Sequence, residues 1–284
     1  MIRQIRYRIE AALAWLLLCF FRFMPLDAAS AVGGFLGRAI GPHLGATRIA
    51  RRNLASALPE CATEHEAIIR DMWDNLGRNI AEYAHLAGST ILDRVQVEGM
   101  EHLDALRAQN IPVFFISGHF GNWELLPTVA MQIGMPLHLI YRPANNPYVD
   151  HLIRHLRSPF YAGMYPKGAS GALRILRALK RGDPIGLLVD QKMNEGIPVP
   201  FFGRDAMTTP AMAQLALKFD IPVLPAYIRR TDGAHFTLTV CPPIHFAKDT
   251  SPLDAMTQVN QLLESWIRAY PSQWFWVHNR WPKP

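Results

Sequence analysis

We predict an α/β fold with a mixed, largely parallel sheet flanked by helices, and three observations support this. From about Gln96 onward, short apolar runs alternate with helical patterns, which is typical of parallel strands covered on both faces. Half of the 284 residues are hydrophobic, enough for a large core. No low-complexity linker, internal repeat or long charge run divides the chain. The sequence therefore indicates one α/β domain with an N-terminal helical extension.

Residues 1–25 are predicted to be associated with a membrane. Arginines up to Arg8 precede an unbroken apolar run from Ala11 to Phe21. This run is shorter than the ~20 residues that cross a bilayer as a straight helix, so a marginal anchor and an interfacial helix both stay open. Ala29-Ser30-Ala31 also resembles a signal-peptide cleavage site, which leaves cleavage as an alternative.

Residues 26–284 are predicted to form the main domain, with a helical part at 26–95 and an α/β part at 96–284. In the helical part we expect a helix over 27–40 and a second one that starts at a capping box and carries an apolar stripe over 63–80.

The stretch that follows residue 112 combines a buried strand with polar residues. Val113–Ile116 is short, aromatic and β-branched, which favours a strand, and His119 comes just past its end. Pro127 is tolerated only in the first turn of a helix, so the helix that runs to Ile133 is expected to start near Glu124. We therefore predict a strand, a tight loop and a helix start.

His119 and Glu124 form a His-x4-Glu pair in this loop. On one continuous helix, residues five apart lie about 140° from each other, so the loop is needed to bring the two side chains together. We expect Glu124 to hold one ring nitrogen of His119 while the other points into a cleft, which would make a general base. The spacing alone occurs about once by chance in a chain with 11 histidines and 23 acidic residues. The strand-loop-helix setting favours function over a structural histidine.

Two more polar residues follow predicted strands. Arg142 comes after the strand at 137–140, and Asp190 ends the strand at 184–189; helices are expected at 146–156 and 170–181. The carboxyl ends of parallel strands meet at one edge of a sheet, so Arg142, Asp190 and His119 are expected to converge. Arg142 is a candidate for binding phosphate or an oxyanion. Asp190 is either a catalytic or orienting carboxylate or the cap of the next turn.

No cofactor or metal site is predicted. His151 and His155 lie four apart on a predicted helix, but the glutamate of the metalloprotease motif and a third ligand are missing. Serine-hydrolase, C-x-x-C and dinucleotide motifs are also absent from the sequence. The three cysteines are widely spaced and are predicted to be reduced thiols.

The chain is basic, with a formal net charge of +6, which indicates an anionic partner. Nucleic acid, an anionic membrane, a phosphorylated lipid and an acidic carrier protein all fit this charge. Nucleic acid is disfavoured because the aromatic residues fall mostly inside apolar runs. Two basic clusters are either solvated faces or binding sites: Arg48, Arg51 and Arg52, and Arg174, Arg177 and Lys180.

The segment Ser117-Gly118-His119-Phe120-Gly121-Asn122-Trp123-Glu124 resembles the His-x4-Asp/Glu motif of the late lipid A acyltransferases, the lauroyl and myristoyl transferases within the lysophospholipid acyltransferase superfamily. The glutamate favours this branch over the glycerol-phosphate enzymes, which usually carry aspartate. Further matching segments follow in order: Tyr141-Arg142-Pro143, Asp190-Gln191, Phe201-Phe202-Gly203 with Thr209-Pro210, and Val277-His278-Asn279-Arg280-Trp281.

The resemblance implies a glycerolipid-acyltransferase-like fold and a membrane-bound enzyme on the cytoplasmic face of the bacterial inner membrane. Its donor would be an acyl carrier protein thioester, and its acceptor the hydroxyl of a 3-hydroxyacyl chain on a lipid A precursor, an anionic glycolipid. Transfer would be direct, because no serine or cysteine is evidently paired with His119. An alternative acceptor is a lysophospholipid, another glycolipid or an ornithine-type lipid.

The resemblance also implies roles for individual residues. His119 would be the general base and Glu124 its orienting carboxylate, while Arg142 would bind acceptor phosphate or developing charge. The residues expected to bind substrate or organise the site are Arg142, Asp190, Gln191, Asn122 and Trp123; Phe201 and Phe202, with Trp123, are candidates for an acyl groove. The tryptophan-rich tail from Trp274 is either a packed closing segment or an interfacial belt.

Overall fold

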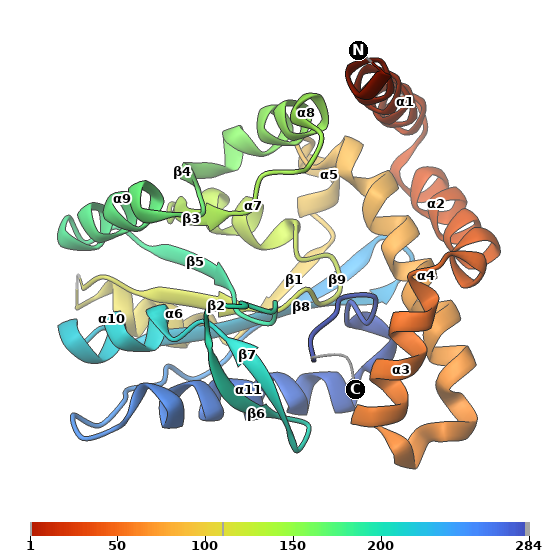
Figure 1. Cartoon of the computed structure of the whole chain (residues 1–284). Coiled ribbons are helices and arrows are strands. Elements are labelled where there is room, and N and C mark those ends of the chain that lie inside the picture. Colours follow the sequence, from red (N-terminus) through yellow and green to blue (C-terminus); the bar gives the residue numbers. More distant parts are fainter. Residues whose placement is uncertain (1, 110, 282–284) are drawn as a thin grey trace.

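The computed structural model describes residues 2–109 and 111–281, and a seven-stranded sheet forms the centre of this part of the chain. The strands are β1 (Val95–Glu98), β2 (Phe114–Ser117), β3 (Leu137–Tyr141), β4 (Tyr161–Pro166), β5 (Ile185–Leu188), β8 (Val223–Asp232) and β9 (His235–Val240). Their order is β1-β9-β8-β2-β5-β3-β4, and every neighbouring pair is parallel except β8 with β9 (Figure 1). The predicted mixed, largely parallel sheet is confirmed.

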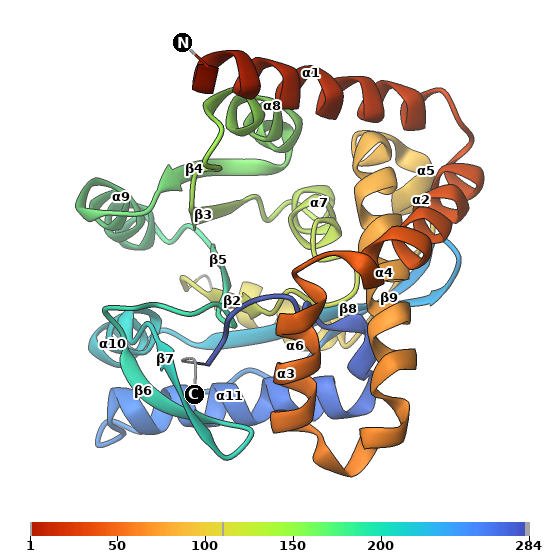
Figure 2. The ribbon, with the colours of Figure 1, turned by 45° about the vertical axis from the view of Figure 1, so that its right-hand side comes forward.

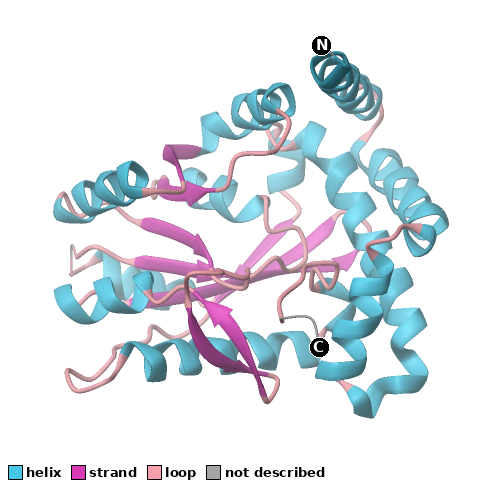
Figure 3. Cartoon of the chain, viewed as in Figure 1, coloured by secondary structure: helices cyan, strands magenta, loops and turns pink. Residues whose placement is uncertain are grey.

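Helices surround this sheet. They are α1 (Ile2–Arg22), α2 (Leu26–Ile40), α3 (Thr47–Ala57), α4 (His65–Glu82), α5 (Ser89–Leu92), α6 (Met100–Arg107), α7 (Leu125–Gln132), α8 (Pro147–Arg157), α9 (Ala169–Lys180), α10 (Ala211–Phe219) and α11 (Pro252–Ala269). Short 3₁₀ helices lie at Gly41–His43, Pro59–Glu64, Tyr83–His85, Ser158–Phe160 and Pro271–Gln273. An antiparallel hairpin of β6 (Ile197–Phe201) and β7 (Arg204–Thr208) packs beside α11 (Figure 3).

Side chains that alternate along β8 show how the sheet is covered on both faces. Val223 belongs to the same core cluster as residues of α9, α10 and α11. The next residue, Leu224, packs with Leu103 of α6, and Ala226 packs with Val129 of α7. This two-residue period places α6 and α7 on one face of the sheet and α10 and α11 on the other.

The N-terminal helices lie at one side of the sheet. Helix α2 packs closely on α4, where a Cβ added to Gly77 would lie 2.1 Å from the carbonyl oxygen of Gly33. Helix α1 runs beside α8 (Figure 2), and Asn146 Nδ2 donates a 2.8 Å hydrogen bond to the carbonyl oxygen of Tyr7. Within the described residues, no helix combines the length and apolar character needed to cross a membrane.

The segment that resembles a cleavage site lies inside α2. Ala29 and Ser30 are fully buried, and the Ser30 hydroxyl donates a 2.6 Å hydrogen bond to Glu82 of α4. A protease acts on exposed, extended chain, so this packing argues against cleavage at Ala29-Ser30-Ala31 in the folded protein.

The elements expected around the site are present. Helix α7 begins at Leu125 with Glu124 at its N-cap, next to the predicted start, and Asn146 caps α8 by accepting hydrogen bonds from two backbone amides. The capping box predicted at the start of the helix over 63–80 is wrong: α4 forms, but Glu64 stands at its N-cap and no side chain bonds there. The helix expected at 170–181 is present as α9.

Candidate active site

His119 is bonded to Asp190 through both its ring and its backbone. Its Nδ1 lies 2.8 Å from Asp190 Oδ1, and its backbone N–H donates to Asp190 Oδ2 at 2.7 Å. The two residues follow β2 and β5, which are neighbours paired in register at Ser117 and Leu188. The carboxylate therefore fixes the ring, with Nδ1 as donor and Nε2 as the available base.

Asp190 is buried and ionised. Burial alone would raise the pKa of its carboxyl group, but the nearby His119, together with hydrogen bonds from His119 and Trp274, holds that pKa well below the usual range. Trp274 Nε1 donates to Oδ2 at 2.8 Å. A carboxylate satisfied in this way can stabilise an imidazolium when His119 takes up a proton.

The C-terminal segment clamps the histidine loop. Phe120 forms an antiparallel bridge with Trp274, and the backbone N–H of Phe275 donates to the carbonyl oxygen of His119 at 3.1 Å. The N–H of Gly121 donates to the carbonyl oxygen of Gln273 at 2.9 Å. These backbone bonds hold the loop at three consecutive residues.

A buried polar cluster holds the other side of this loop. Asn75 and Asn79 of α4 both donate to the carbonyl oxygen of Gly121, at 3.1 and 2.6 Å. Arg230 bonds both asparagines and pairs with Glu82, whose side chain is fully buried. Gly121 has φ +54, and a Cβ there would lie 2.0 Å from the carbonyl oxygen of Ile228, so this corner requires glycine.

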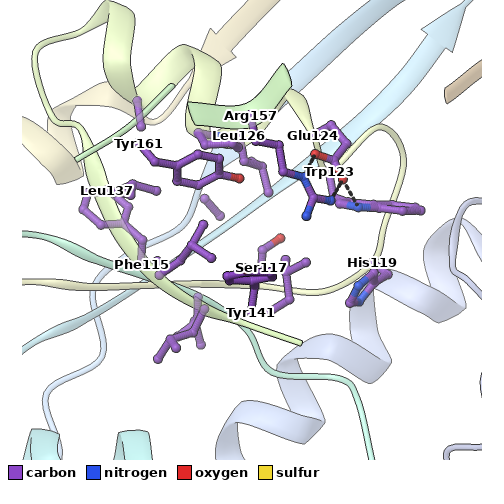
Figure 4. Close-up of a pocket in the computed structure, with 18 of the residues that line it drawn as sticks. Phe115, Ser117, His119, Trp123, Glu124, Leu126, Leu137, Tyr141, Arg157 and Tyr161 are labelled. Atoms are coloured by element: carbon purple, nitrogen blue, oxygen red, sulfur yellow. Dashed lines mark hydrogen bonds and ion pairs between the residues drawn. The ribbon is translucent and has the colours of Figure 1, made fainter. Parts of the chain in front are cut away.

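The prediction that Glu124 holds a ring nitrogen of His119 is wrong. Glu124 instead pairs with Arg157 of α8 through both carboxylate oxygens, with Arg157 Nε 2.9 Å from Oε2 (Figure 4). The reason is topological: Asp190 reaches His119 from the neighbouring strand, while Glu124 at the N-cap of α7 faces α8. Burial alone would lower the pKa of Arg157, but Glu124 and nearby tyrosines raise it above its usual range, so the guanidinium stays charged.

Trp123 connects the two pairs. Its Nε1 donates to Glu124 Oε1 at 3.1 Å, and its ring packs edge-on against the His119 ring with centroids 5.1 Å apart. Phe275 contacts both rings. Glu124 therefore has no direct hydrogen bond to the His119 ring. It holds the indole of Trp123, which in turn supports the position of the His119 ring.

His119 lies on a cavity of about 550 Å³, within the size range of small-molecule sites. Successive residues of β2, from Ser117 back to Phe115, line it, so it extends from the carboxyl end of this strand toward its start. Its far wall includes Leu103, which packs against Val113 at the beginning of the strand. The walls are mainly apolar, from α6, α7 and the sheet; the polar and charged residues of the lining include Ser117, Glu124, Arg142, Arg157, Gln191 and His278.

The predicted binding residues are only partly brought together. Arg142 is exposed at the cavity, and no hydrogen bond or ion pair joins it to another residue of the described chain. Gln191 Nε2 lies 3.1 Å from His119 Nε2. Asn122 does not line the cavity; it is fully buried and donates to Glu82 at 2.7 Å. Its place is therefore in the buried cluster, away from substrate.

Phe201 and Phe202 are also absent from the cavity, so their prediction as groove residues is wrong. Phe201 is fully buried and stacks on Trp281 with centroids 5.4 Å apart, and Phe202 packs near Trp276. Both belong to the core on the α11 side of the sheet. The tail is thus a packed closing segment, and the interfacial-belt alternative is wrong.

Two residues of the site were not predicted as such from the sequence. Arg157 is 33 positions from Glu124, and no local pattern links them. His278 stood only in a matching segment; it lines the cavity near His119, and burial lowers its pKa to about 4. As for metals, the described residues contain no cluster of three or more histidine, cysteine or acidic side chains placed to bind an ion.

Comparison with known proteins matches the chain to one protein family. The family model for bacterial lipid A biosynthesis acyltransferases matches residues 2–283. The chain is 27% identical to a lipid A biosynthesis palmitoleoyltransferase of Escherichia coli (strain K12), over 87% of this chain and 83% of that protein. It is 28% identical to a lipid A biosynthesis lauroyltransferase of the same organism, over 82% of this chain and 78% of that protein. A lipid A biosynthesis myristoyltransferase, also from that organism, is 26% identical over 87% of this chain and 77% of that protein.

Proposed function

The chain belongs to the bacterial lipid A biosynthesis acyltransferase family and is therefore an acyltransferase, and we propose that it moves a fatty acyl chain from acyl carrier protein to a 3-hydroxyacyl hydroxyl on a lipid A precursor. The observation that carries this proposal is a histidine oriented by a buried carboxylate at an apolar cavity. The histidine supplies a base for the hydroxyl, and the cavity can hold an acyl chain.

His119 performs the proton transfers and Asp190 supports it. His119 Nε2 removes the proton of the acceptor hydroxyl while the oxygen attacks the thioester carbonyl, and Asp190 stabilises the resulting imidazolium. When the carbon–sulfur bond breaks, the imidazolium returns its proton to the leaving thiolate. The products are an ester and the free thiol of the carrier.

Transfer is direct, without an acyl-enzyme. Within residues 2–109 and 111–281, the His119 ring bonds to Asp190 and Gln191 and to no hydroxyl or thiol. Ser117 lines the cavity, but among the described residues its hydroxyl makes only a long hydrogen bond, to the carbonyl oxygen of Gly118. A base without a protein nucleophile favours attack by the acceptor oxygen itself.

Arg142 is the group best placed to bind an acceptor phosphate. It follows β3 at the carboxyl edge of the sheet, lines the cavity and is exposed, so its guanidinium is available for bidentate contacts. Glu124 and Arg157 neutralise each other, and their role is to hold Trp123 against His119.

The acceptor is a lipid, so the enzyme must reach a membrane. We propose that α1 binds the cytoplasmic face of the bacterial inner membrane. One face of α1 exposes Ile9, Leu13, Leu16 and Phe20 at helical spacing, and Phe23 just beyond the helix is 89% exposed. Arg3 and Arg6 in the first turns can meet anionic head groups. Helix α1 is thus proposed to lie in the membrane interface.

Flotation with vesicles containing anionic lipid tests the membrane proposal. Leu13→Glu with Leu16→Glu should abolish co-flotation, while Leu253→Glu, at an exposed apolar position on α11, should leave it unchanged. Equal binding of both variants would refute an α1 membrane surface.

The activity is tested with purified protein in detergent, labelled acyl carrier protein thioesters of several lengths, and either a lipid A precursor or a lysophospholipid. Label is expected in the lipid A precursor. Transfer to the lysophospholipid alone would keep the chemistry and replace the acceptor, and transfer to neither would contradict the proposed donor and acceptor.

A further inference from the structure

One ring nitrogen of His278 is committed to the protein backbone. The N–H of Lys192 donates to Nε2 of His278 at 2.8 Å. A nitrogen that accepts this bond carries no proton, so the neutral ring has its proton on Nδ1. Burial lowers the pKa of His278 to about 4, so the ring is neutral near pH 7. His278 therefore offers a single N–H donor.

This donor has no partner among the residues that the structure describes. No hydrogen bond from Nδ1 to another described residue exists, and Nδ1 is not one of the enclosed side-chain atoms that lack a partner. His278 lines the cavity together with His119 and Gln191. Nδ1 is thus an unused donor that a molecule in the cavity can reach.

The backbone around His278 is fixed before substrate binds. Its carbonyl oxygen accepts hydrogen bonds from Asn53 Nδ2 at 2.7 Å and from the N–H of Arg280 at 2.8 Å. Arg280 is fully buried and is bonded to Met207 and Thr208 of β7. A donor held in this way needs no reorganisation during the reaction, which is the property that makes an oxyanion site effective.

We propose that His278 is a second catalytic residue, whose Nδ1–H donates to the oxyanion that forms on the thioester carbonyl. The inference rests on the proposed acyl transfer. The acceptor oxygen bonds to the carbonyl carbon, its proton passes to His119, and the electron pair of the C=O bond moves to the oxygen that faces His278. The C=O bond then re-forms, the C–S bond breaks, and the thiolate takes the proton back.

The electrostatics favour a neutral donor here. A cation beside His119 would oppose the positive charge that this ring acquires as a base. His278 donates without carrying charge, whereas Gln191 points its amide at His119 Nε2 and Arg142 is left for acceptor phosphate. The structure thus separates proton transfer, carbonyl polarisation and phosphate binding.

Two isosteric substitutions of His278 separate the role of its Nδ1–H donor from the role of the hydrogen bond that Nε2 accepts from Lys192. An Asn amide group reaches the position of Nδ1, so His278→Asn keeps a donor toward the cavity and loses the acceptor for Lys192. A Gln amide reaches the position of Nε2, so His278→Gln keeps the acceptor and loses the cavity donor. His278→Gln is expected to lower kcat about 10²-fold with the KM of both substrates unchanged, and His278→Asn to retain most of kcat.

The outcomes are distinct. Wild-type enzyme without transfer to any acceptor would refute the proposed function itself. With an active wild type, full activity in His278→Gln, or a reversed order of the two variants, would overturn the donor role. A raised KM for the lipid acceptor with unchanged kcat would assign His278 to phosphate binding and also overturn it. Imidazole ¹⁵N shifts of the wild type need no substitution: a proton on Nδ1 supports the proposal, and a proton on Nε2 refutes it.

Discussion

Asp190 Oδ1 lies 2.8 Å from His119 Nδ1, which leaves Nε2 as the nitrogen of this ring that can take a proton from a hydroxyl. Because Asp190 also binds the backbone N–H of His119 and the indole of Trp274, it joins the two neighbouring strand ends and the C-terminal segment in one contact.

Asp190→Asn should impair the base while preserving the packing. The amide can present its nitrogen to Nδ1, which would favour the tautomer with the proton on Nε2 and block proton uptake from the substrate. We expect kcat to fall by about 10³–10⁴-fold, as when the carboxylate of a catalytic triad is replaced. Steady-state kinetics with thermal unfolding as a folding control measure this, and an active, folded variant would contradict the assignment.

Glu124 and Arg157 should be coupled in stability. Glu124→Gln leaves a partly buried guanidinium without its partner and is expected to destabilise the protein by about 3 kcal/mol. In Glu124→Gln with Arg157→Met the cation is gone, so the double variant should be less destabilised than the sum of the single variants. Urea unfolding followed by tryptophan fluorescence gives the free energies of unfolding for this double-mutant cycle. Additive effects would mean that the pair contributes no coupling energy.

His278 should make stability depend on pH. Its pKa is about 4 in the folded protein and near 6.5 in the unfolded chain, so between these values the unfolded chain binds more protons. The wild type should therefore lose stability as the pH falls from about 6.5 toward 4, and His278→Gln should lose less. Unfolding free energies of both proteins across this range test the difference, and parallel curves would contradict a neutral, half-buried His278.

The cavity should set the preferred donor length. Met100 of α6 lines the cavity on the same helix as Leu103 of its far wall. Met100→Trp would fill part of the space beside α6, which should shift the preference toward shorter acyl chains. Phe201→Leu is the matched control, because Phe201 lies in the core outside the cavity; we expect it to cost on the order of 1–3 kcal/mol of stability with the chain-length preference unchanged. Competition between thioesters of different lengths measures this preference. An equal shift in both variants would mean that the cavity does not hold the donor chain.

Much of the fold could be predicted, because its signals are local. The apolar run before His119, the first-turn Pro127 and the helical pattern at 146–156 each indicated an element from its own residues. The convergence of His119 and Asp190 also followed, since parallel strands end at the same edge of a sheet.

The partners within the site could not be predicted from spacing. Asp190 lies 71 residues from His119 and bonds it only because β5 is the neighbour of β2, a pairing that no local pattern specifies. The nearer carboxylate, Glu124, was the natural choice from sequence, but it pairs with Arg157 on another helix. Phe201 and Phe202 failed for a related reason: aromatic residues suit a lipid groove and a core equally well until their neighbours are known.

The measurement that tests the central claim most directly is the rate of acyl transfer by His119→Ala under saturating donor and acceptor. It is compared with the wild type and with Gln191→Ala, which removes the other side chain bonded to the His119 ring. We predict that His119→Ala is folded and binds both substrates but loses transfer by at least about 10³-fold, while Gln191→Ala keeps most of it. Substantial turnover by a folded His119→Ala would contradict general-base catalysis by this histidine.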